Sequence, residues 1–120
     1  MTFKNIRPIL WTHKLEETIV FYTTILGFNC AEKNDDWGWA SLSRNEAEIM
    51  LAKPNEHMPF EKPVFTGSFY INVDNVDELW EILRSKCRVL YEIENFPWEM
   101  REFAVYDNNG YILQFGQPII

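Results

Sequence analysis

Residues 96–116, FPWEMREFAVYDNNGYILQFG, carry the strongest structural signal in this chain. Two apolar-rich segments, expected as strands at about 99–106 and 111–117, flank the turn sequence DNNG at 107–110. Asp opens such turns, Asn tolerates left-handed backbone geometry, and Gly supplies a positive φ. The stretch therefore predicts a β-hairpin in the last quarter of the chain.

The same order of predicted elements occurs twice along the chain. Apolar periodicity predicts helices at 14–26 and 76–87, with Leu15 and Ile19 of the first helix matching Val76 and Trp80 of the second at a spacing of 61 residues. The expected strands are 4–11, 28–33, 37–43 and 47–52 in the first half and 67–73, 88–94, 99–106 and 111–117 in the second. Gly27 is expected as a helix C-cap, and Asn75 with Glu78 as a capping box.

This repetition predicts an α+β fold made of two βαβββ modules. The chain of 120 residues has the size of a single domain. We expect one domain over 1–120, with module 1 to about residue 53, a proline-containing linker at about 54–66, and module 2 at about 67–120. Each mixed four-stranded sheet would carry its helix on one face, which leaves the other face to curve around a cavity like a cup.

Composition excludes several classes of function. The net charge is −7, whereas a nucleic-acid-binding protein needs a basic face, so no nucleic-acid partner is expected. No apolar run is long enough to cross a bilayer, so no membrane association is expected. The two cysteines form no disulfide framework, which favours a reducing cytoplasm. Aromatic residues make up 16% of the chain, enough to fill a core or to line a pocket.

Particular motifs resemble a known superfamily. They are FY at 21–22 with LGF at 26–28, VDNV at 73–76, and the run from Trp98 through REF at 101–103 to the turn at 107–110. The chain resembles the vicinal oxygen chelate superfamily, also called the glyoxalase / bleomycin resistance protein / dioxygenase superfamily, and is most similar to its bleomycin resistance branch. The resemblance implies paired βαβββ modules, cup-shaped mixed sheets and a homodimer.

The resemblance also implies four places for the ligands of one divalent metal, which the enzymes of the superfamily fill with His, Glu or Gln. In this chain those places are occupied by Arg7, Met50, Ser68 and Gln114. Arg has no acceptor atom, Met is a soft ligand and Ser is a weak neutral one, so only Gln114 suits such a metal. His13, at the start of the first helix, and His57, in the linker, do not restore the site. We therefore expect no metal, no cofactor and no catalytic residue.

Strand alternation predicts which side chains face the cup. We expect Val105 to pair with Ile112 and Phe103 with Gln114 across the turn. This register would place the side chains of Arg101 and Phe103 in the cup, while those of Leu113 and Phe115 would face the helix. With tryptophans at the rim, the candidate ligand-binding residues are Trp37, Trp39, Met50, Tyr70, Trp98, Arg101, Phe103 and Gln114.

Three functions are compatible with these observations. The first is a metal-independent protein that sequesters a hydrophobic, aromatic or cationic small molecule at a dimer interface, as the resemblance to antibiotic-resistance proteins of the bleomycin branch implies. The alternative is a lyase or dioxygenase with a degenerate or non-standard metal site, or a metal-free enzyme that uses Glu102, Tyr70 or Arg101 in acid–base work. The third is a sensor or accessory subunit with a filled cup.

Overall fold

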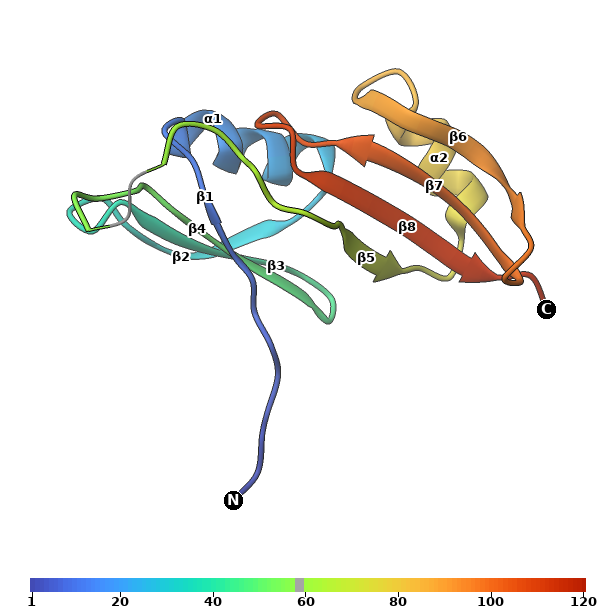
Figure 1. Ribbon diagram of the computed structural model, residues 1–120, viewed down its shortest axis with the longest axis horizontal. Coiled ribbons are helices and arrows are strands. Elements are labelled where there is room, and N and C mark those ends of the chain that lie inside the picture. The colour runs from blue at the N-terminus through green and yellow to red at the C-terminus, as the bar shows by residue number, and fades with distance from the viewer. Residues whose placement is uncertain (58–59) are drawn as a thin grey trace. The chain divides into compact units, whose positions relative to one another are not determined.

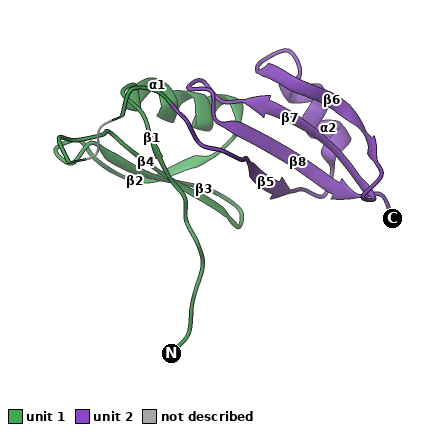
Figure 2. Cartoon of the chain, viewed as in Figure 1, with its two compact units in different colours: residues 1–62 green, residues 63–120 purple. Residues whose placement is uncertain are grey.

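The computed structural model describes residues 1–57 and 60–120. It divides into two compact units, residues 1–62 and 63–120, and each unit is described by itself (Figure 2). Among the described residues, no helix combines the length and the apolarity needed to span a membrane.

The first unit is a βαβββ module with one mixed sheet (Figure 1). Its elements are β1 (Ile9–Trp11), α1 (Leu15–Val20), the π-helical turn η1 (Phe21–Ile25), β2 (Asn29–Asn34), β3 (Trp39–Arg44) and β4 (Ala47–Ala52). The strand order is β1-β4-β3-β2, in which β1 and β4 are parallel and the other neighbours are antiparallel.

The second unit repeats that topology (Figure 1). Its elements are β5 (Phe69–Asn72), α2 (Val76–Leu83), β6 (Arg88–Phe96), β7 (Met100–Tyr106) and β8 (Ile112–Pro118). The strand order is β5-β8-β7-β6, again with the first pair parallel. The predicted α+β class with two βαβββ modules and mixed sheets is confirmed.

Several predicted elements are shorter in the structure than the sequence indicated, and two of them have a clear local cause. The strand expected at 4–11 comprises only Ile9–Trp11, because Pro8 has no amide hydrogen to donate to the sheet and contributes only its carbonyl, 2.9 Å from the amide of Met50. The second helix ends at Leu83 rather than at 87, and its last carbonyl accepts the amides of Lys86 and Cys87.

The core of each unit lies between its helix and its sheet. The predicted helix faces are buried, with Leu15, Ile19 and Tyr22 on the first helical segment. In the second unit, Trp80 of α2 packs against Phe103 of β7 with ring centroids 5.1 Å apart, and Phe103 stacks on Phe115 of β8 at 5.3 Å. Phe103 is fully buried by these contacts, so β7 and β8 both turn their aromatic side chains toward α2.

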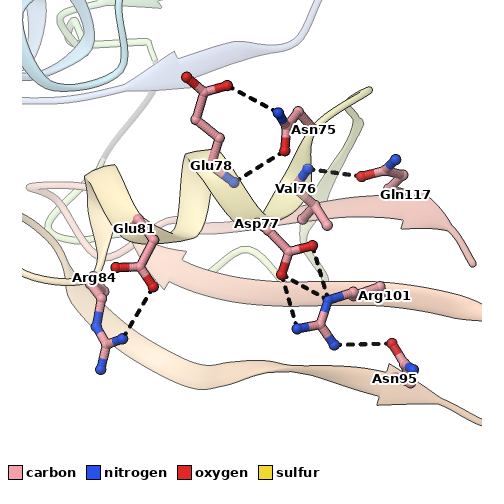
Figure 3. Close-up of polar contacts among 9 residues, drawn as sticks. All are labelled: Asn75, Val76, Asp77, Glu78, Glu81, Arg84, Asn95, Arg101 and Gln117. Atoms are coloured by element: carbon pink, nitrogen blue, oxygen red, sulfur yellow. Dashed lines mark hydrogen bonds and ion pairs between the residues drawn. The ribbon is translucent and has the colours of Figure 1, made fainter.

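The N-terminus of α2 is held by polar contacts to the sheet (Figure 3). Asn75 accepts the amide of Glu78 at 3.2 Å and donates to its carboxylate at 3.1 Å, so the expected cap forms with a side-chain bond in place of the usual return bond to the backbone. Gln117 accepts the amide of Val76 at 2.9 Å. Helix and sheet are thereby joined at this end.

The hairpin at 107–110 forms, but its register differs from the predicted one. The structure pairs Tyr106 with Ile112, Val105 with Leu113 and Phe103 with Phe115, one residue away from the predicted pairing. The reason is that Tyr111 belongs to the loop. One carboxylate oxygen of Asp107 accepts the amides of Asn109, Gly110 and Tyr111 at 2.8–2.9 Å, and the Asp107 amide donates to the Tyr111 carbonyl at 2.9 Å.

A one-residue shift exchanges the two faces of a strand. The prediction that Phe103 and Arg101 face the cup is therefore wrong, since both lie on the α2 side of the sheet. Arg101 binds Asp77 of α2 through three contacts of 2.9–3.2 Å and also donates to Asn95 at 3.1 Å (Figure 3).

Replacing Asp107 with Ala tests the role of this turn. The substitution removes the shared acceptor of three loop amides, so we expect the free energy of unfolding to fall by about 1–3 kcal/mol. Urea denaturation monitored by circular dichroism measures the change. Asp107→Asn retains an acceptor oxygen and is expected to lose much less. Equal stability of Asp107→Ala and the parent would contradict the assigned role of the carboxylate.

Candidate functional site

The second sheet carries a polar cluster on the face turned away from α2. This face, called here the Glu102 face, presents side chains from all four strands of the sheet and from the loop that precedes β5. They are Ser68, Tyr70, Tyr91, Glu102, Ala104 and Gln114.

Glu102 is the centre of the cluster. Its side chain is only 1% exposed, and its carboxylate has four hydrogen-bonding neighbours. One oxygen accepts the Tyr70 hydroxyl at 3.0 Å and the Trp98 indole N–H at 2.8 Å. The other accepts a short bond from the Tyr91 hydroxyl and a longer one, 3.3 Å, from the Gln114 amide. Four donors equal the accepting capacity of an ionised carboxylate.

The direction of these hydrogen bonds follows from the chemistry of the donors. The Gln114 amide nitrogen can only donate, and it lies 2.7 Å from the Tyr91 hydroxyl oxygen. Tyr91 accepts there and so directs its own proton to Glu102. The Gln114 carbonyl accepts the Ser68 hydroxyl, which sets the orientation of the amide. A chain of hydrogen bonds therefore runs from Ser68 through Gln114 and Tyr91 to the buried carboxylate.

Gly116 gives Tyr70 room to reach this carboxylate. Gly116 lies opposite Glu102 in the ladder between β7 and β8, and Tyr70 comes from β5 on the far side of β8. A Cβ atom at Gly116 would overlap the phenol oxygen of Tyr70. The glycine is thus required for close approach of the ring, because the side chain must cross the backbone of β8.

Aromatic rings surround the buried carboxylate. Phe96, at the end of β6, stacks on Trp98 with centroids 4.8 Å apart and an interplanar angle of 16°, and Tyr91 contacts Phe96 edge-on at 5.4 Å. Trp98 is 59% exposed although its N–H is hydrogen-bonded. The hydrogen bond fixes the orientation of the indole, so the exposed ring face is preorganised to contact a ligand.

The pKa values of the two tyrosines in the cluster are raised, which favours the neutral form of each phenol. Burial, followed by hydrogen bonding to Glu102, raises the pKa of Tyr70 to about 12 and that of Tyr91 to about 12. Within residues 1–57 and 60–120, no Lys, Arg or His side chain forms an ion pair with Glu102. The carboxylate is held by neutral donors.

The structure brings together three of the predicted site residues, Tyr70, Trp98 and Gln114, on the Glu102 face. Arg101 and Phe103 lie on the opposite face. Sequence reasoning missed Tyr91, Phe96 and Gly116 and did not recognise Glu102 as the centre. Matching the apolar positions of both hairpin strands, 103 and 105 with 113 and 115, would have placed Glu102 correctly.

The other predicted site residues lie on the first unit, on the face of its sheet turned away from the buried core. Met50 of β4 pairs with Ile9 of β1 and Ser41 of β3. Trp39 of β3 contacts Trp37 with ring centroids 6.5 Å apart, and Trp37 is 74% exposed. This face combines Trp39, Met50 and Ile9 with Ser41, whereas the Glu102 face centres on a buried carboxylate.

The side chains at the metal-ligand places do not fit a divalent metal. Arg7 precedes β1, Met50 is a thioether, and the Ser68 hydroxyl is hydrogen-bonded to Gln114. In the part of the chain that the structure describes, no three His, Cys, Asp or Glu side chains gather as a metal site requires. Gln114 instead belongs to the hydrogen-bond chain that ends at Glu102.

The tyrosine shifts predict a pH dependence. Because folding raises both pKa values from about 10 to about 12, the stabilisation from these phenols is complete below pH 10 and is lost as the pH rises toward 12. Tyrosinate absorbance of the folded protein should show Tyr70 and Tyr91 titrating near pH 12. Glu102→Gln should lower these two midpoints part of the way toward 10, with Tyr70→Phe and Tyr91→Phe assigning them. An unchanged titration curve for Glu102→Gln would contradict the proposed coupling.

Comparison with known proteins gives matches along almost the whole chain. Residues 6–115 match the family model of the Glyoxalase/Bleomycin resistance protein/Dioxygenase superfamily. The chain is 28% identical to the bleomycin resistance protein of Geobacillus stearothermophilus, covering 93% of this chain and 95% of the relative. The bleomycin resistance protein of Staphylococcus aureus (strain N315) matches with the same identity and coverage.

Solved structures share the fold at lower identity. A glyoxalase/bleomycin resistance protein/dioxygenase from Nocardioides has a TM-score of 0.81 at 19% identity, covering 99% of this chain and 86% of that one. Lactoylglutathione lyase from Agrobacterium tumefaciens has a TM-score of 0.75 at 18% identity, covering 98% and 96%. The family model and these folds agree, and the chain belongs to the glyoxalase/bleomycin resistance protein/dioxygenase superfamily.

Proposed function

We propose that this protein binds and sequesters a small organic molecule without changing it chemically, in the manner that the name of its bleomycin resistance relatives suggests. The observation that carries the proposal is Trp98, a largely exposed indole whose N–H is hydrogen-bonded to the buried Glu102 carboxylate. Aromatic surface combined with a few oriented polar groups is the usual composition of a small-molecule site. Tyr70, Gln114 and Trp98 would contact the ligand on the second unit, and Trp37, Trp39 and Met50 are proposed as ligand-binding residues of the first unit.

The state of the polar groups favours binding over acid–base catalysis. With pKa values of about 12, Tyr70 and Tyr91 keep their protons at neutral pH and give poor general bases or acids there. Of the other two candidates, Arg101 binds Asp77 on the opposite face, and both carboxylate oxygens of Glu102 already accept two hydrogen bonds each. The donors at the metal-ligand places do not support metal-dependent lyase or dioxygenase chemistry, so the proposed function is metal-independent.

Ligand binding is tested with a panel of aromatic and cationic compounds that includes bleomycin. A compound that binds the native state raises the melting temperature, and stacking on Trp98 quenches tryptophan fluorescence. Trp98→Ala should weaken binding of the compounds found by about 1–3 kcal/mol, while Trp98→Phe, which keeps a ring but loses the N–H, should lose less. Mass spectrometry should recover the bound compound unchanged.

Two outcomes would overturn the proposed function. One is a panel in which no compound raises the melting temperature, or in which Trp98→Ala binds every compound as tightly as the parent. The other is about one nickel, zinc, manganese or iron ion per chain retained through dialysis, which would support the enzymatic alternative. Elemental analysis of the purified protein gives the second result independently of any ligand.

We further propose that the protein is a cytoplasmic homodimer with its ligand cleft at the dimer interface. Both cysteines are free thiols, in keeping with a reducing compartment. The segment before β1 runs away from the first sheet (Figure 1), and its Phe3 and Ile6 side chains are 88% and 92% exposed. Apolar side chains displayed in this way favour contact with a second copy.

Light scattering at micromolar concentration should report twice the chain mass of 14.3 kDa. Because the proposed contact is apolar, raising the salt concentration should not dissociate the dimer, whereas Phe3→Ser combined with Ile6→Ser should shift it toward monomer. Lys4→Ser is the matched control in the same segment. A monomer at all concentrations tested would contradict the dimer proposal.

A further inference from the structure

We propose that Glu102 determines ligand specificity and makes the Glu102 face a receptor for an organic cation, such as an alkylated ammonium group, in preference to a neutral aromatic compound. This inference rests on the proposed function, since it names the ligand class of the same site. It is carried by the charge balance of the face and by the way its aromatic rings are attached to the carboxylate.

Within the described residues, the Glu102 carboxylate has no cationic partner among its hydrogen-bond donors. All four donors to Glu102 are neutral, so they solvate the carboxylate without cancelling its charge. A buried charge that lacks a counter-ion is costly, and a bound cation would offset that cost. The structure therefore has an electrostatic reason to favour a positively charged ligand over a neutral one of the same shape.

A second carboxylate lies beside the first. Glu94 of β6 pairs with Glu102 across the ladder, which places both side chains on the same face, and Glu94 is exposed. Among the described residues, neither carboxylate takes part in an ion pair. The exposed Glu94 carboxylate thus adds to the negative electrostatic potential of the Glu102 face.

Arg88 and Arg101, the cationic residues on β6 and β7, already make contacts with other residues. Arg101 is on the opposite face and binds Asp77 and Asn95. Arg88 lies over the ring of Tyr106, 4.1 Å from its centroid. Tyr106 is four residues from Glu102 along β7, about 13 Å away in an extended strand. Neither guanidinium neutralises the Glu102 carboxylate.

The aromatic rings of the Glu102 face are attached to the carboxylate itself. Tyr70, Tyr91 and Trp98 all donate from their polar edges to Glu102, so one carboxylate positions three ring systems. Hydrogen bonds polarise their partners, and donation to an anion increases the electron density of the donor ring. Electron-rich ring faces attract cations within about 6 Å. Glu102 therefore favours a cation directly by its charge and indirectly through these rings.

The test compares two probes of the same shape, choline and its neutral isostere 3,3-dimethylbutan-1-ol. Titrations at low salt, followed by the indole N–H signal of Trp98 in NMR spectra, give both affinities. We expect the parent to bind choline about tenfold more tightly than the isostere, in the range of a cation–π contact supported by a nearby charge. In Glu102→Gln this preference should fall to about twofold or less, mainly through weaker choline binding.

Glu46→Gln is the matched control, because it removes the same charge from an exposed turn of the first unit and should leave the preference unchanged. Equal affinity of the parent for choline and the isostere, including no detectable binding of either, overturns the inference. So does a Glu102→Gln variant that retains the tenfold preference. If Glu102→Gln does not fold, the comparison of the two probes on the parent still decides. Neutral aromatic compounds that bind without any cation preference would overturn this inference while leaving the proposed function intact.

Discussion

The register of the β7–β8 hairpin is the constraint on which the site depends. One carboxylate oxygen of Asp107 accepts hydrogen bonds from three loop amides, so Tyr111 stays in the loop and the ladder begins at Tyr106 and Ile112. This pairing sends Phe103 and Phe115 together toward Trp80 and leaves Glu102 on the other face. A shift of one residue would bury the carboxylate against the helix and remove the polar cluster altogether.

A buried carboxylate in turn requires hydrogen-bond donors at fixed positions around it. Glu102 can remain buried only because donors from the neighbouring strands and from the β6–β7 turn saturate its oxygens. Tyr70 reaches it across Gly116, and the Trp98 indole is attached by its N–H while much of its ring stays exposed. The stability of the second unit and the presentation of its aromatic surface therefore depend on the same group.

The two units share a topology but differ in the face turned away from their cores. The first unit presents Met50 between Ile9 and Ser41, with tryptophans nearby, and the second presents a satisfied carboxylate among tyrosines. The repeat thus preserves the helix-side packing, which the fold needs, and varies the opposite side, where we propose that the ligand binds. Gln114, at a place where the family resemblance implied a metal ligand, here continues a hydrogen-bond chain.

The α+β class, the two βαβββ modules and the buried helix faces around Leu15 and Trp80 could be predicted from the amino-acid sequence, because they follow from local periodicity and turn chemistry. At the metal-ligand places that the family resemblance implies, residue chemistry marked Arg7, Met50 and Ser68 as unsuitable. The face that each hairpin strand presents depends on the folded loop, since one loop residue inverts the alternation. The partners of Glu102 come from strands and a turn distant in sequence, and their convergence results from sheet pairing, which no local pattern encodes.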